Sequence, residues 1–325
     1  MKAAVVIPNY NGLKYLKPCL ESLKCQSEQD FATIIIDNAS KDGSIEFIRE
    51  YYPEIMLIEN QENLGFSKAV NQGIAVTKTP YVILLNNDTV VQQDFVKELV
   101  NAIEQNPSYF SVSSKMLSYR ERDKVDDAGD MINLFGWSFQ RGNAHNETEY
   151  NEKKEVFSSC AGAAIYRMEV LNRIGVFDPL HFAYLEDMDL GFRAKRYGYK
   201  NMFCPGAVVY HIGSATSGSS LSEFKVRLTA RNQVFLWYKN MPLLQILTNL
   251  PFLLMGCLLQ CIMFGKRGFL KAYLNGLLEG IKRAKECKKV HCGIQHIGSV
   301  IRIQIDMIKG TWIYVSDKIT RKIVK

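Results

Sequence analysis

The sequence predicts an α/β fold, with a mostly parallel sheet flanked by helices and a helical C-terminal region. Short apolar runs alternate with amphipathic segments through the N-terminal third, which is the pattern of βαβ units. The clearest strand is Tyr81–Leu85, where five apolar or aromatic residues end abruptly in Asn86, Asn87 and Asp88. A short continuous apolar run of this kind is typical of a parallel strand buried on both faces.

Four strands and four helices are predicted in alternation. The expected strands are Ala3–Ile7, Phe31–Ile36, Ile55–Ile58 and Tyr81–Leu85. The expected helices, read from apolar residues at helical spacing, are Lys14–Lys24, Ser44–Tyr52, Gly65–Thr77 and Phe95–Glu104. Right-handed crossovers bring the carboxyl ends of such strands to one edge of the sheet, where α/β proteins bind their ligands.

Composition distinguishes the body of the chain from its tail. With 325 residues, 47% of them hydrophobic, the chain can form one large domain or two smaller ones. Eight cysteines without a CxxC pair indicate reduced thiols in a cytosolic protein, and the N-terminal apolar run is too short for a signal peptide. Residues Lys266–Lys325 contain 14 Lys and Arg against 4 Asp and Glu, a net charge of +10, which leaves −3 for the first 265 residues. This asymmetry suggests a membrane or nucleic-acid surface for the tail, and neither for the body.

Polar residues follow every predicted strand. They are Pro8, Asn9, Tyr10 and Asn11; Asp37, Asn38 and Ser40; Asn63 and Gly65; and Asn86, Asn87 and Asp88. A carboxylate beside neutral oxygens suits a hard divalent cation that carries phosphates, and a helix N-terminus favours anions. Ordinary turn chemistry explains any single loop equally well, but not four on one edge. The absence of a GxGxxG motif and of a P-loop disfavours a Rossmann dehydrogenase or a kinase.

These motifs resemble those of the family 2 glycosyltransferases of Rossmann-like GT-A fold, and of their rhamnosyltransferase-like branch in particular. The resemblance rests on Val6–Asn11, Asp37–Gly43, Asn63–Phe66, Asn71–Gly73 and Leu84–Asp88, in that order. It implies a nucleotide-diphosphate sugar donor whose nucleoside contacts Pro8–Asn11 and Asp37. It also implies that Asp88 closes a DxD-type motif and reaches Mg²⁺ or Mn²⁺ and the diphosphate. Asn86 stands where the fuller pattern has Asp, and an amide oxygen is the weaker ligand, so Asp88 is taken as the main one.

The resemblance extends the expected donor site. A small-residue run around Ala161 and Gly162 looks like the family's floor under the donor sugar, and Arg231 is expected to pair with the diphosphate. A salt bridge on a helix surface is an equal alternative for Arg231. The implied donor-binding residues are Pro8, Asn9, Tyr10, Asn11, Asp37, Asn38, Ser40, Asn63, Gly65, Phe66, Lys68, Asn71, Asn86, Asn87, Asp88, Ala161, Gly162 and Arg231.

A second informative stretch runs from Phe177 to Arg193. The residues after Glu186 have helical spacing, so Glu186 and Asp187 lie in a first turn, where the helix dipole favours carboxylates. A simple acidic helix start is the alternative. Sugar transfer needs an acceptor hydroxyl that loses its proton as the C1–phosphate bond breaks, and a carboxylate can accept that proton. The stretch resembles the family's Glu-Asp motif, which implies Asp187 as the base and Glu186 as the residue that orients the acceptor.

Other acceptor and metal contacts are expected from the middle of the chain. Tyr184 is expected to pack on a sugar face, with Phe182 and Trp137 as further acceptor contacts. The segment Val112–Val156 is polar and irregular, and an exposed loop explains it as well as an acceptor-side segment does. His211 ends a predicted strand and resembles a family position that contacts the metal or diphosphate, with a structural role as the alternative. The Gly- and Ser-rich segment Gly213–Ser220 is expected to close over bound donor.

The C-terminal region contains one long apolar segment. Leu243–Phe264 has only four polar residues and is about long enough to span a bilayer. Three arrangements are weighed, namely an in-plane helix pair on the membrane, a soluble helical domain or homodimer interface, and a single span. The basic cluster Lys282–Lys289 suits anionic lipid head groups. No nucleic-acid module is recognisable, so nucleic acid is not an expected partner.

Together these features predict an inverting, metal-dependent glycosyltransferase. It would move a hexosyl or deoxyhexosyl group, plausibly rhamnosyl, to a saccharide acceptor such as a lipid-linked one, in cell-surface polysaccharide assembly at the cytoplasmic face of the membrane. Residues 1–115 would form the donor half, 116–235 the acceptor and catalytic half, and 236–325 the helical C-terminal region. The alternative is a catalytically silent sugar-nucleotide or glycan-binding scaffold at the membrane. A nucleotidyltransferase would need a Gly-rich basic loop after the first strand, which is absent.

Overall fold

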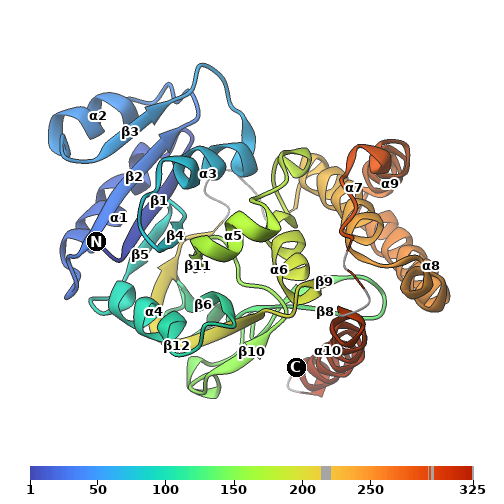
Figure 1. Cartoon of the computed structure of the whole chain (residues 1–325). Coiled ribbons are helices and arrows are strands. Elements are labelled where there is room, and N and C mark those ends of the chain that lie inside the picture. The colour runs from blue at the N-terminus through green and yellow to red at the C-terminus, as the bar shows by residue number, and fades with distance from the viewer. Residues whose placement is uncertain (214–220, 292, 294–295, 324–325) are drawn as a thin grey trace.

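The computed structural model describes residues 1–213, 221–291, 293 and 296–323. The segment predicted to close over the donor lies, at 214–220, outside the described residues. A large sheet forms the centre of the molecule, helices cover both of its faces, and the C-terminal helices gather at one side (Figure 1). The α/β prediction, with a helical C-terminal region, is confirmed.

The large sheet consists of ten strands. They are β1 (Ala3–Asn9), β2 (Phe31–Asp37), β3 (Met56–Glu59), β4 (Tyr81–Leu85), β5 (Thr89–Val91), β6 (Tyr109–Ser118), β7 (Val125–Asp127), β10 (Lys154–Val156), β11 (Ala163–Arg167) and β12 (Lys200–His211). The main order is β10-β12-β6-β11-β4-β1-β2-β3, with β5 paired to β12 and β7 to β6. A separate hairpin joins β8 (Asp130–Ile132) to β9 (Ser138–Gln140).

Strands β3, β2, β1 and β4 form a parallel half-sheet, as predicted. β1 pairs in parallel with both β2 and β4, and β2 pairs in parallel with β3. Their carboxyl ends therefore meet at one edge, which brings the polar loops together. The other half is mixed, because β11 is antiparallel to its neighbours β4 and β6 while β12 is parallel to β6.

Helices cover the two faces because alternate residues of each buried strand point to opposite sides. Val5 and Ile7 of β1 pack in one cluster with α1 (Leu13–Lys24), α2 (Ser44–Tyr51) and α4 (Phe95–Glu104). Ala4 and Val6 pack in another cluster with α3 (Gly65–Val76), α5 (Met168–Ile174) and α6 (Glu186–Arg196). Both faces of β1 are thus apolar, which is why its sequence is a continuous apolar run.

The segment between residues 112 and 156 departs from the prediction. It was expected to be irregular, but it contains most of β6 and the short strands β7 to β10, followed after β9 by the 3₁₀ turn η1 (Glu147–Glu149). Each of these short strands has only three residues, too few to show a period in the sequence. The predicted division after residue 115 falls inside β6, and the one after residue 235 falls inside α7 (Glu223–Asn240).

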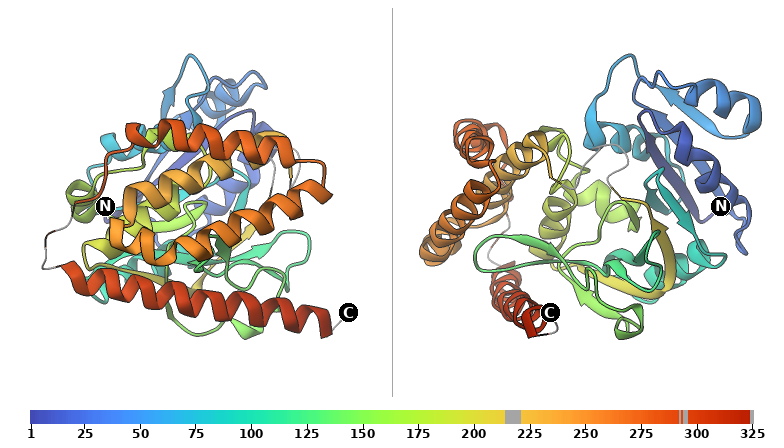
Figure 2. Two further views of the ribbon diagram at one scale, coloured as in Figure 1. Left: turned by 90° about the vertical axis from the view of Figure 1, so that its right-hand side faces the viewer. Right: turned by 180° about the vertical axis from the view of Figure 1, so that it is seen from behind.

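Four helices lie side by side at the C-terminal side of the molecule (Figure 2). They are α7, α8 (Leu243–Lys266), α9 (Leu270–Arg283) and α10 (Ile297–Ile323), with the 3₁₀ turn η3 (Ala284–Glu286) after α9. Helix α9 approaches α7 closely, because a Cβ on Gly276 would lie 2.3 Å from the Arg227 carbonyl oxygen. Helix α10 returns to the body, where Ile303 and Met307 are fully buried in one cluster with Phe157 and Phe192.

Helix α8 is the one described helix long and apolar enough to cross a membrane by length and composition. One side of it is buried through Gln245, Asn249, Leu253 and Gly256. The rest presents leucines and other large apolar side chains to the surface, and α9 and α10 do the same. We call this the apolar face. Its members include Leu243, Leu244, Leu247, Leu254, Leu258, Ile262, Leu274, Leu278, Ile281, Ile297, Ile301, Ile305, Ile308, Trp312 and Ile319.

A buried ion-pair cluster joins α6 to α7. Asp189, which is fully buried, accepts hydrogen bonds from Arg193, Lys239 and Asn240. Lys239 also bonds Asp178 at 2.6 Å. Burial alone would raise the pKa of Asp189, but the charges of Arg193 and Lys239 outweigh it and lower that pKa. The cluster fixes α6, and with it the predicted catalytic residues, on the C-terminal half.

His181, in the 3₁₀ turn η2 (Pro179–His181), should make the fold sensitive to acid. The ring is fully buried and packs on Phe235, and burial lowers its pKa from 6.5 to about 4. Below pH 6.5 His181 binds a proton in the unfolded chain, whereas in the folded chain it does so only near pH 4. The free energy of unfolding is therefore highest above pH 6.5 and falls as the pH decreases toward 4. Relative to His181→Leu, the wild type should lose about 3 kcal/mol between those pH values, as measured by urea unfolding. Parallel stability curves for the two proteins would contradict this.

Candidate active site

A network of short hydrogen bonds joins the ends of β1, β2 and β4. Asn9 Nδ2 donates to Asp37 Oδ2 at 2.7 Å, and Asn87 Nδ2 donates to Asn9 Oδ1 at 2.6 Å. The backbone N–H of Ser40 donates to Asp37 Oδ1 at 2.7 Å. Asn9, Asp37 and Asn87 are all buried, and Asp37 is 0% exposed. The network therefore fixes three predicted donor loops relative to one another, with Asp37 as its internal acceptor.

The loop after β1 is shaped by this network. Gly12 has no room for a side chain, since a Cβ there would lie 2.0 Å from Asn87 Nδ2 and 2.4 Å from Asn9 Oδ1. Asn11 has a left-handed backbone (φ +49°), and its N–H donates to Ser40 Oγ at 2.8 Å. The accessible rim of the network consists of Pro8, Tyr10, Asn11 and Ser40.

The loop after β3 leads into α3 and meets the segment before α6. Asn63 Oδ1 accepts from the Gly65 N–H at 2.9 Å, and Asn38 Nδ2 donates to the Gly65 carbonyl at 3.3 Å. Gly65 has φ +81°, and a Cβ there would lie 2.6 Å from the ring of Phe182. Phe182, a predicted acceptor residue, is thus brought against the predicted donor loop.

Two residues predicted to bind donor contact Phe177. Asn71 Nδ2 donates to the Phe177 carbonyl at 2.7 Å, and Asn71 Oδ1 accepts from the Phe177 N–H at 3.1 Å. The Phe66 ring lies edge-on to Phe177, with centroids 6.2 Å apart. Both residues hold the segment before α6 against α3. Both polar ends of the Asn71 amide are occupied in this way, which corrects the prediction for Asn71, whereas Phe66 is only partly buried and stays a predicted donor contact. Lys68 is exposed on α3 and stays a prediction.

Asp88, His211 and Asp126 form a linked group at the end of β4. His211 Nε2 lies 3.4 Å from Asp88 Oδ1, and His211 Nδ1 lies 2.6 Å from Asp126 Oδ2. The Ile212 N–H also donates to the Asp88 carbonyl at 3.0 Å, which holds the end of β12 beside the loop. The two residues predicted as metal ligands, 123 positions apart in the sequence, are therefore neighbours.

The Asp88–His211–Asp126 group fits a divalent cation. Burial would lower the pKa of His211, but hydrogen bonds from the ring to Asp126 and Asp88 outweigh burial and raise that pKa to about 10. Two carboxylates thus place negative charge where a cation would lie. An imidazole whose second nitrogen is oriented by a carboxylate is a common metal-ligand arrangement. Asp88 can supply one ligand, and His211 a second once an arriving cation displaces the Nε2 proton that faces Asp88. Other positions are left for phosphate oxygens and water.

Asp187 lies at the first turn of α6, next to the small-residue floor. Its Oδ2 accepts from the Ala161 N–H at 3.3 Å and its Oδ1 from the Met188 N–H at 2.7 Å. On the other side of that floor, Asn86 N–H donates to the Gly162 carbonyl at 2.8 Å. Ala161 and Gly162 therefore connect the DxD-type loop to the predicted base.

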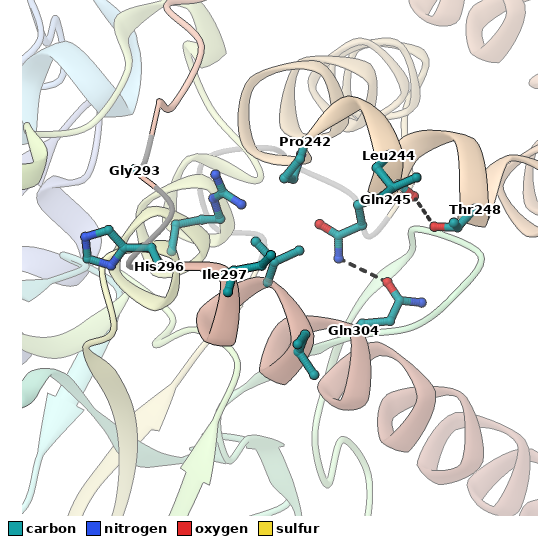
Figure 3. A pocket seen from close by; sticks show the side chains of 11 residues that line it. Pro242, Leu244, Gln245, Thr248, Gly293, His296, Ile297 and Gln304 are labelled. Carbon is teal, nitrogen blue, oxygen red and sulfur yellow. Dashed lines mark hydrogen bonds between the residues drawn. The ribbon is translucent and has the colours of Figure 1, made fainter.

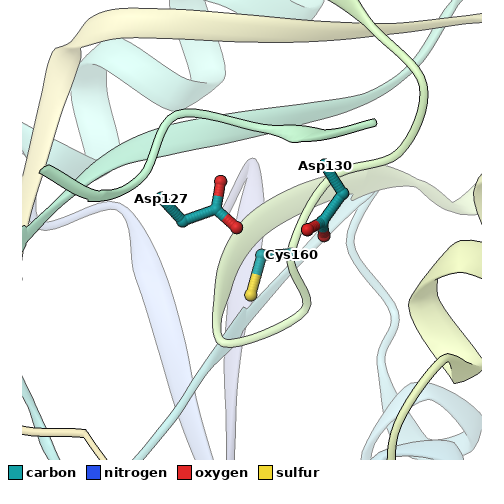
Figure 4. A group of neighbouring side chains, drawn as sticks. All are labelled: Asp127, Asp130 and Cys160. Carbon is teal, nitrogen blue, oxygen red and sulfur yellow. The ribbon is translucent and has the colours of Figure 1, made fainter. Parts of the chain in front are cut away.

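Asp127, Asp130 and Cys160 form an acidic group (Figure 4), and the charge of Asp187 acts on both aspartates. Their ligand atoms all lie within 4.8 Å of one another, and Asp127 Oδ2 has no partner among the described residues. Burial, and then the charge of its neighbour, raises the pKa of each carboxyl. Burial likewise raises the pKa of the Cys160 thiol. The raised pKa values favour the protonated forms of these groups, and a metal ion would have to displace those protons.

Glu186 and Asp187 also have perturbed acidities. Burial raises the pKa of Asp187, although its backbone hydrogen bonds act in the opposite direction. Burial and the charge of Asp187 raise the pKa of Glu186 well above its usual value, and Glu186 Oε2 has no partner among the described residues. A carboxylate with a raised pKa is a stronger base, which suits Asp187 for removing a proton from a hydroxyl.

The loop before α6 is strained and is held by α7. Phe182, Tyr184 and Leu185 have φ values of +62°, +70° and +62°, a conformation that costs L residues about 1–3 kcal/mol each. Asn232 Nδ2 lies within 3.0 Å of the carbonyl oxygens of residues 181, 183 and 184. Lys225 lies over the Tyr184 ring, 5.4 Å from its centroid. The strain is therefore compensated by bonds to α7, which present Tyr184 next to Glu186 and Asp187.

Arg231 belongs to the same support, and its guanidinium is bonded to protein groups. Its guanidinium is buried and donates to the Leu180 and His181 carbonyls, to Asn232 and to Glu279 of α9. With these four bonds made, Arg231 is a structural residue. The alternative weighed for it, a salt bridge, is close to what the structure shows.

Trp137 packs against the C-terminal helices. It follows the turn between β8 and β9, where its ring packs on Phe135 at 5.0 Å and on Tyr314 of α10 at 5.6 Å. A Cβ on Gly256 of α8 would lie 3.1 Å from Trp137 Nε1. Trp137 therefore joins the hairpin to the C-terminal helices, and its contact with the acceptor stays a prediction.

The sequence-based site omitted Asp126, Asp127 and Asp130. Three aspartates among five residues were noticed only as part of a polar segment, because no strand could be recognised there. The sequence signal that could have identified them is the density of carboxylates around Gly129. In the structure this glycine has φ +96°, which marks a turn between the aspartates. Such a cluster is expensive unless it is partly protonated or faces a ligand.

The family model described as Glycosyl transferase family 2 matches residues 4–175, more than half of the chain. The matched range contains all four strand-end loops, Asp88, the acidic group and the floor. It ends before α6, so Glu186 and Asp187 lie outside it.

Two curated relatives are rhamnosyltransferases. The N-acetylglucosaminyl-diphospho-decaprenol L-rhamnosyltransferase of Mycobacterium tuberculosis is 24% identical over 237 residues, which cover 66% of this chain and 77% of the relative. The O-antigen chain rhamnosyltransferase RfbN of Salmonella typhimurium is 27% identical over 228 residues, which cover 69% of this chain and 70% of the relative.

A solved structure shares the fold. The mannosyltransferase PcManGT of Pyrobaculum calidifontis, in complex with GDP-Man and Mn²⁺, superposes with a TM-score of 0.53 and 15% identity and covers 87% of each chain. At this identity the likeness concerns the fold, which is GT-A-like.

Proposed function

The chain belongs to glycosyl transferase family 2 and is a glycosyltransferase that uses a nucleotide sugar, and from this we propose that it transfers a hexosyl or deoxyhexosyl group with inversion to a saccharide acceptor. Rhamnosyl is the group we favour, because both curated relatives described above are rhamnosyltransferases. The observation that carries the proposal is the position of Asp187. It is joined through Ala161 and Gly162 to the loop that contains Asp88.

On the donor side, we propose that the rim of the strand-end network holds the nucleoside. Pro8, Tyr10, Asn11 and Ser40 are accessible, and Asn9, Asp37 and Asn87 fix them from below. Asp88 and His211 would hold Mg²⁺ or Mn²⁺ at the diphosphate, with Asp126 orienting the imidazole. When bound, the ion supplies positive charge that stabilises the departing diphosphate.

On the acceptor side, we propose that Asp187 is the base. The acceptor hydroxyl oxygen forms a bond to C1 of the sugar while the bond from C1 to the diphosphate oxygen breaks. The electron pair of that bond leaves with the nucleoside diphosphate, and the hydroxyl proton moves to Asp187. Glu186, which is buried and protonated more readily than a free carboxyl, can donate a hydrogen bond to the acceptor. The strained loop would place Tyr184 against the acceptor ring.

The first test is release of nucleoside diphosphate by the purified chain. It would be offered UDP-, GDP-, dTDP- and CDP-sugars, including dTDP-rhamnose, with Mn²⁺ or Mg²⁺ and with EDTA. We expect slow hydrolysis of one donor, reduced by at least about a hundredfold in EDTA because the leaving diphosphate loses its counter-charge. Hydrolysis that survives EDTA would contradict the metal-dependent mechanism. If no donor in the panel is hydrolysed and none binds, the result favours the silent scaffold.

We propose that the apolar face lies on the surface of a membrane. Helix α8 packs against the body through Gln245, Asn249, Leu253 and Gly256, which lie on one side of its first four turns. A helix that crossed a bilayer would have to leave this contact. With α9 and α10 presenting apolar side chains beside it, a monotopic contact agrees better with the packing than a span does. The basic cluster Lys282–Lys289 follows α9 and suits acidic head groups.

Substitutions on the apolar face should release the protein from membranes. Leu247 and Leu258 are 56% and 62% exposed, so Leu247→Gln with Leu258→Gln should leave the fold intact. Each leucine contributes about 1.5 kcal/mol or more when it enters lipid, so vesicle affinity should fall on the order of a hundredfold in co-sedimentation. Met56→Gln with Val76→Gln, exposed positions far from α8 in the sequence, is the matched control. Unchanged vesicle binding with loss of a dimer would identify the face as a homodimer interface.

Removal of residues 243–325 would not test the membrane contact cleanly, because it would also disturb the fold. Helix α10 covers buried residues of the catalytic half, and its Asp306 bonds the buried Lys195 of α6 at 3.0 Å. Truncation would expose Phe157 and Phe192, so release from the membrane could not be separated from unfolding. We therefore propose that residues 1–115, 116–235 and 236–325 differ in function. They are not separate folding units, because β6 and α7 cross the two boundaries.

A further inference from the structure

A cavity of about 550 Å³ lies between the first turns of α8 and α10 and the end of α6 (Figure 3). Its size is that of a ligand site. It is separate from the proposed active site, because Arg196, which lines it, follows Asp187 by nine residues on α6, about 13 Å along the helix axis. None of the roles proposed above uses this cavity.

One end of the cavity carries a buried cation that has no counter-ion among the described residues. Arg196 is only 4% exposed, and its Nε and Nη1 have no hydrogen-bond partner among the residues the structure describes. Its position in the last turn of α6 is favourable for a cation, but the helix dipole does not satisfy the guanidinium N–H groups. The neighbouring Lys195, by contrast, is paired with Glu155 and Asp306. A buried, unpaired guanidinium indicates an anionic ligand, and phosphate or carboxylate fits its geometry.

Beside Arg196 the cavity has a polar wall of amides. Gln245 Nε2 donates to Gln304 Oε1 at 3.1 Å, and Gln304 Nε2 donates to Asn249 Oδ1 at 2.8 Å. Gln245 Oε1 has no donor among the described residues, and Figure 3 shows it directed away from Gln304. A ligand that satisfies this wall therefore brings a hydroxyl or N–H group as well as a negative charge.

The remaining wall is apolar and opens onto the apolar face. Leu244, Ile297 and Ile301 line the cavity and are 73%, 64% and 57% exposed, so the opening lies among side chains assigned above to the membrane surface. Val300 of α10 also lines the cavity and is half-buried. A ligand whose polar end reaches Arg196 can thus extend a hydrocarbon chain along α10 toward the lipid.

We propose that this cavity binds an anionic glycerophospholipid of the membrane whose head group carries hydroxyls. The phosphate lies on Arg196, a head-group hydroxyl donates to Gln245 Oε1, and an acyl chain follows Leu244, Ile297 and Ile301. The inference rests on the proposed membrane contact and deepens it, since it makes one bound lipid part of the attachment. The lipid is distinct from the acceptor, because α6 separates Arg196 from Asp187.

The test uses the full chain and dihexanoylphosphatidylglycerol below its micelle concentration, titrated by calorimetry. Arg196→Gln should weaken binding about tenfold or more, because a charge-assisted hydrogen bond is lost. Val300→Trp, which fills the apolar part, should weaken binding similarly while leaving Arg196 in place. Arg302→Gln removes the same charge from an exposed position on α10 and should stay within about twofold. Glycerol 3-phosphate, which lacks the chains, should need about a hundredfold higher concentration to compete.

Several results would overturn the proposal. They are wild-type affinity in Arg196→Gln or in Val300→Trp, equal competition by glycerol 3-phosphate, and equal binding of dihexanoylphosphatidylcholine, which carries no head-group hydroxyl. If Arg196→Gln fails to fold, Val300→Trp decides, because its site is partly open to solvent. Donor hydrolysis is measured on the same samples. Lost lipid binding with normal hydrolysis concerns this proposal alone, and absent hydrolysis with normal lipid binding concerns the proposed function alone.

Discussion

Replacing Asp187 by Asn should reduce sugar transfer about a thousandfold while leaving donor affinity within about twofold. Loss of a general base costs on the order of 10²–10⁴ in rate, and the amide has the shape of the carboxylate without its basicity. Asn can keep the 2.7 Å bond from the Met188 N–H and lose only the long 3.3 Å bond from the Ala161 N–H. Against that loss, Asp187 adds a negative charge beside Asp127, Asp130 and Glu186, whose carboxyls all have raised pKa values. Removing that charge relieves repulsion and offsets the lost hydrogen bond, so the free energy of unfolding should change by no more than about 1 kcal/mol.

The measurement is transfer rate at saturating donor, together with donor binding by calorimetry and thermal unfolding. Glu223→Gln is the matched control, since Glu223 is an exposed acid in the first turn of α7. It should change neither rate nor affinity. If Asp187→Asn lost donor affinity by the same factor as transfer rate, Asp187 would not be the base. A variant that retains a tenth of the wild-type rate would contradict the assignment as well.

Replacing Asp88 by Asn should abolish most of the effect of Mn²⁺ on donor binding. Asp88 is 6% exposed, lies 3.4 Å from His211 Nε2 and is the carboxylate of the DxD-type loop. Without its charge the proposed ion keeps one weak amide ligand and the imidazole, so transfer should fall on the order of a hundredfold or more. His211 remains oriented by Asp126, so the fold at this edge should persist.

Binding of the nucleoside diphosphate is measured with Mn²⁺ and with EDTA in wild type and variant. The wild type should bind more tightly with Mn²⁺, and Asp88→Asn should bind about equally in both conditions. Asp123→Asn, an exposed aspartate in the turn between β6 and β7, should behave as wild type. An undiminished Mn²⁺ effect in Asp88→Asn would remove Asp88 from the metal site.

The N-terminal half could be predicted because its signals are local. Strands such as Tyr81–Leu85 are buried on both faces and appear as unbroken apolar runs, and parallel pairing then brings their polar ends together. That argument correctly anticipated that Asn9, Asp37 and Asn87 would lie close together. The approach of His211 to Asp88 also followed, although only from the resemblance and not from spacing.

The errors concern residues whose role depends on distant partners. Arg231 and Asn71 have the chemistry of ligand-binding residues, but their partners are backbone carbonyls of the strained segment at 177–184. That segment carries polar backbone groups in positions that regular structure cannot satisfy, so side chains from α3 and α7 satisfy them. The sequence contains no local sign of this demand. Asp127 and Asp130 were missed for a related reason, since their neighbours Cys160 and Asp187 are distant in the sequence.

Helix α10 has a consequence for the order in which the protein matures during synthesis. It supplies Ile303 and Met307 to a core that also contains Phe157 and Phe192, so that core stays open until α10 has emerged from the ribosome. The leucine-rich α8 emerges earlier. If the apolar face contacts a bilayer, as proposed above, a nascent chain can attach before the core that needs α10 has closed. A chain that has not attached then exposes two apolar surfaces to chaperones and proteases instead of one.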